Sequence, residues 1–116
     1  MKIPNIIQKN VIKLFDELPY RERGIIINEE LIIITMEILN KSKDKTLPQN
    51  CKKERIEKTP FGLDKLIKEK LGDDTMRATI ISDELQKKGI VTVFKAVNEK
   101  TGRLINHTKL NKEWTW

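Results

Sequence analysis

The chain has 116 residues, of which 38% are hydrophobic and 34% charged, so it is long enough for one domain and too apolar for a disordered tail. Its net charge of +6 favours a polyanionic partner. Cys51 has no second cysteine to pair with and His107 is the one histidine, so we expect no disulfide, no metal, no cofactor and a cytoplasmic location. No run approaches the ~20 apolar residues of a membrane span, and we expect no membrane partner.

The first expected element is a helix over residues 5–18. Asn5 follows Pro4 and stands three residues before Gln8, which is a capping-box arrangement. The apolar residues at helical spacing are Ile7, Val11, Leu14, Phe15 and Leu18. Pro19 ends the helix, and the segment LPYRERG is predicted to be a connector.

The isoleucine-rich stretch over residues 25–40 fits either a strand or a helix. Its β-branched residues favour a strand. However, Asn28 can cap a helix, the two glutamates after it suit a helix start, and Lys41 suits a helix end. We therefore predict a helix over about 29–41 after an extended piece at 25–27. So apolar a helix must be buried, either within the domain or across an interface between two copies.

Residues 42–58 are predicted to be a loop or mobile linker, because they hold few apolar residues and show no periodicity. Residues 41–58 carry seven basic and three acidic side chains, so the excess positive charge is concentrated there. This charge run is either a solvated segment or a basic arm that contacts phosphates. Ile56 is a candidate for a short strand.

Two helices joined by a tight turn are predicted next. Thr59 and Pro60 mark the start of the first helix, and Gly72 marks its end. Its apolar stripe is Leu63, Leu66, Ile67 and Leu71, and the side chains expected outside are Asp64, Lys65, Lys68 and Glu69. Asp74 is expected to cap the second helix, which runs to Gly89.

The two sides of this second helix differ in character. At about 100° per residue, Ala78, Ile81 and Leu85 cluster on one side, with Ile80 at the border. The side chains expected on the opposite side are Thr75, Thr79, Asp83 and Gln86.

After Gly89 the sequence IVTVFKAV alternates and is rich in β-branched residues, which predicts a strand. Residues 98–102 then form a short hairpin loop, with Asn98 bonded to its own backbone and Gly102 at positive φ. RLINHTKL is the returning strand. His107 is expected to pack near Phe94 across the hairpin.

The order of parts over residues 59–110 resembles the winged helix-turn-helix DNA-binding superfamily, in particular small bacterial and archaeal transcriptional regulators. The residues that carry the resemblance are Leu85, Gly89, Ile90 and Val91 at the end of the second helix, and Ala78 and Ile81 at its core positions. It covers about half the chain. It implies a mainly α fold with a small β-hairpin (α+β), namely a winged helix-turn-helix with an extra N-terminal helix.

The expected organisation is a single domain over residues 1–116. It consists of N-terminal helices at 5–41, which are a candidate dimer interface, a basic linker at 42–58, the helix-turn-helix plus wing at 59–110, and a tail at 111–116. Trp114 and Trp116 in this tail are expected to pack over the core, because tryptophan buries a large apolar area.

The resemblance implies a homodimer that binds double-stranded DNA, as a transcriptional regulator or as a replication or partition factor of a mobile element. The implied DNA-binding residues are Thr75, Met76, Arg77, Thr79, Lys95, Lys100 and Arg103. The first four lie on the second helix, where a methyl group can contact thymine and arginine can reach phosphate or guanine. The other three surround the hairpin tip and would neutralise phosphates.

Four acids lie near the same surface and would oppose phosphates, namely Asp73, Asp74, Asp83 and Glu84. They motivate an alternative, a winged-helix protein–protein interaction module such as a phage-type inhibitor or a subunit of a nucleic-acid enzyme, for example a restriction nuclease. We expect no enzyme activity in this chain, because it has no phosphate-binding glycine loop, no HExxH and no nucleophile beside a base.

Overall fold

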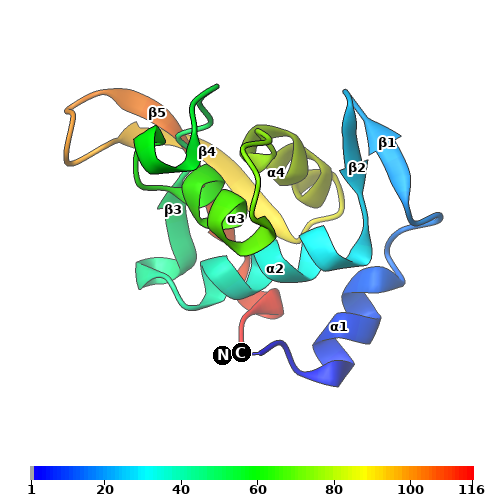
Figure 1. Ribbon diagram of the computed structural model, residues 1–116. Helices are drawn as coiled ribbons and strands as arrows, with labels where there is room; N and C mark the ends of the chain where they lie inside the picture. Colours follow the sequence, from blue (N-terminus) through cyan, green and yellow to red (C-terminus); the bar gives the residue numbers. More distant parts are fainter. Residues whose placement is uncertain (1) are drawn as a thin grey trace.

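In the computed structural model, which describes residues 2–116, the chain forms an α+β unit built around helix α2 (Figure 1). The helices are α1 (Asn5–Ile12), α2 (Glu29–Asn40), α3 (Leu63–Leu71) and α4 (Ala78–Lys87). The strands are β1 (Tyr20–Glu22), β2 (Ile25–Ile27), β3 (Thr46–Pro48), β4 (Val91–Val97) and β5 (Leu104–Leu110). Three short 3₁₀ helices, η1 (Lys43–Lys45), η2 (Ile56–Lys58) and η3 (Lys112–Trp114), complete this part of the chain.

Helix α2 begins as predicted, because Asn28 Oδ1 accepts a hydrogen bond from the Leu31 N–H at 2.8 Å. Its most buried apolar side chains are Leu31, Ile32, Met36, Ile38 and Leu39, none more than 2% exposed. Helices α3 and α4 and strand β5 contact α2, so the chain itself buries this helix. The helical interpretation of residues 29–41 is confirmed, and the extended piece before it is β2.

The larger sheet is antiparallel with the order β3-β5-β4. Val93 and Leu47 both lie opposite Thr108, and this sheet face meets α4, where Ser82 Oγ lies 2.7 Å from Thr108 Oγ1. The predicted β4–β5 hairpin is confirmed. In its loop, Asn98 Oδ1 accepts from the Lys100 N–H at 2.9 Å, and Gly102 has a φ of +71°.

The N-terminal third differs from the prediction. Helix α1 ends at Ile12 rather than at residue 18, and no side chain caps its start. The N–H groups of Leu14 and Phe15 bond three residues back, which tightens the chain and ends the helix. Phe15 is then buried outside the helix at 8% exposure.

The segment predicted to be a connector contains β1, which pairs with β2 in a hairpin. Its two-residue turn, Arg23 and Gly24, has φ values of +46° and +82°. Such turns are usually marked by Asn-Gly or Asp-Gly. Arginine at positive φ is uncommon, so the sequence carries a weak signal for this hairpin.

Residues 42–58 are folded, contrary to the prediction of a loop or mobile linker. They contain η1, η2 and β3, which pairs with β5 at residues 46–48. The short strand is therefore not at Ile56, which begins η2. Residues 46–48 of this charged segment therefore form an edge strand of the sheet, which its composition does not predict.

Both helices of the predicted pair begin later than expected. Helix α3 starts after Gly62 rather than at Thr59. Thr59 is buried in the loop before the helix, at 2% exposure. A Cβ on Gly62 would lie 2.5 Å from Pro48 O, so β3 passes too close for a side chain. Helix α4 starts after Arg77, and Asp74 does not cap it, because its Oδ1 accepts from the Ile56 N–H at 2.9 Å.

Candidate nucleic-acid interface

The start of α4 is capped by a side chain from α3. Asp64 Oδ1 accepts hydrogen bonds from the N–H groups of Arg77 at 3.0 Å and Ala78 at 3.2 Å. These are the free donors of a helix start. Asp64 and Lys68 are both fully buried, and Asp64 Oδ2 lies 3.2 Å from Lys68 Nζ. The prediction that both point outward is therefore wrong.

Lys68 holds the loop over residues 51–59 against α3. Its Nζ donates to Lys52 O at 2.9 Å, Glu54 O at 2.9 Å and Thr59 Oγ1 at 3.0 Å, which uses all three protons. Its pairing with Asp64 Oδ2 is therefore an ion pair without a hydrogen bond. The loop over residues 51–59 folds over α3 through these contacts.

This anchored loop presents positive charge. Its exposed cations are Lys52, Lys53, Arg55 and Lys58. The bond from the Ile56 N–H to Asp74 ties the same loop to the turn that precedes α4. Cys51 Sγ lies 3.6 Å from Asp64 Oδ1, and burial raises the pKa of this thiol. The basic segment predicted to be a loop or mobile linker is thus held beside the start of α4.

Arg77 and Asp73 form a bidentate ion pair within the turn. Arg77 Nη1 and Nη2 lie 2.7 and 2.9 Å from the two carboxylate oxygens of Asp73. Hydrogen bonding to Arg77 is the main cause that lowers the pKa of Asp73 to about 2. Asp73 Oδ1 also accepts from the Thr75 N–H at 3.0 Å. The turn is therefore ordered, and Thr75 and Met76 are exposed on it.

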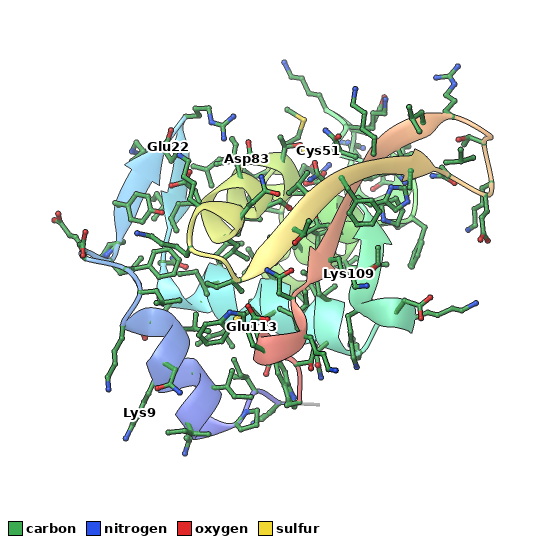
Figure 2. All side chains as sticks on the ribbon, turned by 180° about the vertical axis from the view of Figure 1, so that it is seen from behind. Lys9, Glu22, Cys51, Asp83, Lys109 and Glu113 are labelled. Carbon is green, nitrogen blue, oxygen red and sulfur yellow. The ribbon has the colours of Figure 1, made fainter. Side chains whose placement is uncertain are left out.

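The acids on α4 are paired with neighbouring side chains. Asp83 Oδ2 accepts from Arg23 Nη2 at 2.9 Å, and Glu84 accepts from the Tyr20 hydroxyl and from Lys87 Nζ, each at 2.8 Å. Burial opposes the ionisation of Glu84, but the hydrogen bonds from Lys87 and Tyr20 lower its pKa. The β1–β2 hairpin lies beside α4 (Figure 1), and Glu22 and Asp83 are labelled there in Figure 2.

The remaining predicted residues lie in two places. Thr79 is half-buried, and its Oγ1 donates to Gln49 Oε1 at 3.0 Å. Lys95 is exposed and shares the sheet face of Val91 and Val93, toward α4. Lys100 and Arg103 line a groove on the other side of the hairpin. The structure therefore gathers Thr75, Met76, Arg77 and Thr79 at the start of α4 and separates Lys95 from the hairpin-tip cations.

The packing predictions for the aromatic residues are confirmed. His107 stacks on Phe94 with ring centroids 5.8 Å apart. Trp114 Nε1 donates to Gly89 O at 3.2 Å, and Trp116 exchanges hydrogen bonds with Asn40. Both tryptophans pack against the core.

Sequence reasoning missed Arg21 and Arg23, which lie at the β1–β2 hairpin beside α4. Within residues 2–116, no group of three or more histidine, cysteine and acidic side chains is arranged to hold a metal ion. Over the same residues, no helix is long and apolar enough to cross a membrane. Comparisons with protein-family models, curated proteins and solved structures found no match to this chain.

Proposed function

We propose that the chain binds double-stranded DNA as a winged helix-turn-helix protein, with α4 in the major groove and the β4–β5 hairpin as the wing. The order α2, β3, α3, α4, β4, β5 supports this assignment, as does the pairing of β3 with β5. In winged folds a short first strand often pairs with the hairpin in this way. A small transcriptional regulator, or a replication or partition factor of a mobile element, is the function that we infer.

The observation that carries the proposal is the pairing of charges around α4. Asp73, Asp83 and Glu84 would repel phosphates, but each accepts hydrogen bonds from a cation or hydroxyl of the same chain. In two of the three pairs the cation is the more exposed partner, since the side chains of Lys87 and Arg23 are 65% and 49% accessible against 7% for Glu84 and 36% for Asp83. In the third pair Asp73, at 44%, is more exposed than Arg77, at 16%. The surface around α4 therefore offers positive charge to a polyanion.

We propose different roles for the residues at this surface. Thr75 and Met76 are exposed before the first turn of α4 and can contact base edges, where a methyl group meets thymine. Arg77 is held by Asp73 and orders the turn. The loop at 52–58 and Lys95 would contact phosphates on either side. Lys100 and Arg103 would reach the sugar–phosphate backbone of the DNA only if the hairpin tip lies along it.

A homodimer would present two copies of α4 to one duplex, about one helical turn apart. Helix α2 is buried within the chain, so α1 is the helix of residues 5–41 that is available for this contact. Ile6 on α1 is 65% exposed. Sedimentation equilibrium tests this part of the proposal, and Ile6→Lys is expected to shift a dimer toward monomer.

The protein-interaction alternative has less support at α4. It requires Asp83 and Glu84 to meet a basic partner, but both carboxylates already have partners within the chain.

The test is the salt dependence of duplex binding, measured by fluorescence anisotropy. We expect affinity to fall steeply with salt, and the triple variant Lys52→Gln/Lys53→Gln/Arg55→Gln to flatten the slope by about 0.9 for each phosphate that it no longer neutralises. The matched control removes three cations elsewhere, Lys9→Gln/Lys13→Gln/Lys112→Gln, and is expected to keep a slope close to that of the unmodified chain. Equal slopes for the two triple variants, or no binding at low salt, would contradict the proposal.

A further inference from the structure

A large groove lies on the sheet face that points away from α4. Its volume is about 1010 Å³, and its walls are the β4–β5 hairpin, the β3 region and the segment at 60–61. Phe94, Ala96 and Ile105 share this sheet face, because Phe94 lies opposite His107 and Ala96 opposite Ile105. Phe61, which is 50% exposed, forms part of the far wall. Of its lining residues, the DNA-binding proposal uses Lys52 and, at the hairpin tip, Lys100 and Arg103, but none of the apolar side chains.

A free strand edge of β5 lies beside the groove, which Arg103 and Ile105 of the same stretch line. The last bond between the β3 segment and β5 runs from the Gln49 N–H to Asn106 O at 2.9 Å. Asn50 then turns the chain away with a φ of +43°. Within residues 2–116, no strand covers this edge of β5 beyond that bond, at residues 104–105. An uncovered strand edge can pair with an extended peptide.

The side chains of the groove decide between a peptide and a nucleic-acid strand. Its cations are Lys41, Lys43, Lys52, Lys100 and Arg103, against the acids Asp44 and Glu99. Single-stranded nucleic acid needs open aromatic faces for its bases. Here Phe94 already stacks on His107, and Lys100 Nζ lies 5.3 Å from the ring centroid of Phe61. The apolar floor formed by Phe94, Ala96 and Ile105 instead suits apolar side chains.

We propose that this groove binds an extended acidic segment of a partner protein. The segment adds as a strand beside residues 104–105 of β5. Its alternate apolar side chains pack on Ile105 and Phe94, and its acidic side chains pair with Lys41 and Lys43. This proposal does not depend on DNA binding by α4.

The experiment selects binders to the full chain from a displayed library of random decapeptides. We expect the selected peptides to alternate apolar and acidic residues. Their affinity is expected to fall about tenfold for the pair variant Lys41→Gln/Lys43→Gln. It should stay unchanged for Lys9→Gln/Lys13→Gln, which removes the same charge at residues that do not line the groove. Figure 2 shows Lys9 on α1, away from the β4–β5 hairpin. Duplex binding should respond equally to the two pairs, which separates this proposal from the DNA-binding one.

A second pair of variants tests the apolar floor without changing the charge. Phe94 and Leu14 are both 37% exposed, so Phe94→Ser is compared with Leu14→Ser. We expect only Phe94→Ser to weaken the selected peptides, and backbone N-methylation of a peptide to weaken it as well. Selected peptides without an acidic bias, equal affinities for the paired variants, or tighter binding of a ten-residue oligothymidylate in the groove would overturn the proposal.

Discussion

The residue with the most structural consequences is Lys68. It lies in the middle of α3 and joins the basic loop, through two carbonyl groups, to the carboxylate that caps α4. A fully buried charge is stable only when it is paired and hydrogen-bonded. Lys68 satisfies this requirement for itself and for Asp64, so one side chain fixes the positions of two parts of the proposed DNA surface.

Lys68→Met is expected to lower the free energy of unfolding by about 3–5 kcal/mol, because it leaves Asp64 as an unpaired buried charge. Urea denaturation measures the loss. Lys65→Met, half-buried on the same helix, should change stability by less than about 0.5 kcal/mol. The double variant Asp64→Asn/Lys68→Met should lose less than the sum of its two single variants. An additive double variant would contradict this account.

The pKa of Asp73 tests the ion pair with Arg77. Its folded value of about 2 lies below the ordinary 3.8. The pair therefore stabilises the fold fully above about pH 4, and this contribution is lost as the pH falls toward 2. We expect Arg77→Gln to raise the pKa of Asp73 toward its ordinary value in a carboxyl-detected NMR titration. A value that stays near 2 would show that Arg77 is not the cause.

The helix starts show what the sequence can predict at this scale. The local cap Asn28 is readable, because its acceptor and donor are three residues apart. The cap of α4 cannot be predicted in this way, because Asp64 accepts a hydrogen bond from the N–H of Arg77, which lies 13 residues further along the chain. Charged residues of an amphipathic helix are normally predicted to lie on its solvent-exposed face. Only the folded loop over α3 makes burial of Asp64 and Lys68 favourable.

At the scale of elements, the segment that is predicted from sequence to be a connector forms the β1–β2 hairpin, which supplies partners to the acids of α4. It lies beside α4 and supplies Arg23 to Asp83 and Tyr20 to Glu84. Arg21 is exposed on the same hairpin and has no acid of α4 as a partner. Both arginines carry one positive charge, but only Arg23 is paired with an acidic side chain of α4.

This difference gives a matched pair of variants. Arg23→Gln is expected to weaken duplex binding more than Arg21→Gln, because it removes a cation and also frees the charge of Asp83 toward the phosphates. Adding Asp83→Asn to Arg23→Gln should restore affinity to about the level of Arg21→Gln. Fluorescence anisotropy at one low salt concentration measures all three. Equal losses for the two single variants would mean that the Arg23–Asp83 pair does not affect binding.

At the scale of the whole molecule, the chain presents two unlike surfaces on opposite sides of the β4–β5 hairpin. The α4 side carries paired acids and exposed cations, whereas the groove side carries an apolar floor and a cationic rim. The sequence predicts the hairpin from its alternation, and it places Lys95, Lys100 and Arg103 around one tip. It does not predict that they divide between two faces, because that depends on the strand register and on where the segment at 60–61 packs.

The α+β class, the central helix and the hairpin follow from periodicity and turn residues along the chain. The pairing of β3 with β5 does not, because it joins residues about 60 positions apart. The basic segment at 52–58 is held beside α4 by bonds to Lys68 and Asp74, which lie 14 to 18 residues further along the chain. The candidate site is therefore visible in the sequence as separate charges and becomes one surface only in the fold.

The most direct test of DNA binding through α4 is an NMR titration of the ¹⁵N-labelled chain with a random-sequence duplex at low salt. We predict the largest amide shifts at Thr75, Met76 and Thr79 and along residues 52–58, with smaller shifts at Lys95. Shifts confined to the groove residues Phe94 and Ile105, or no shifts when duplex is in excess, would contradict the proposal that α4 faces DNA.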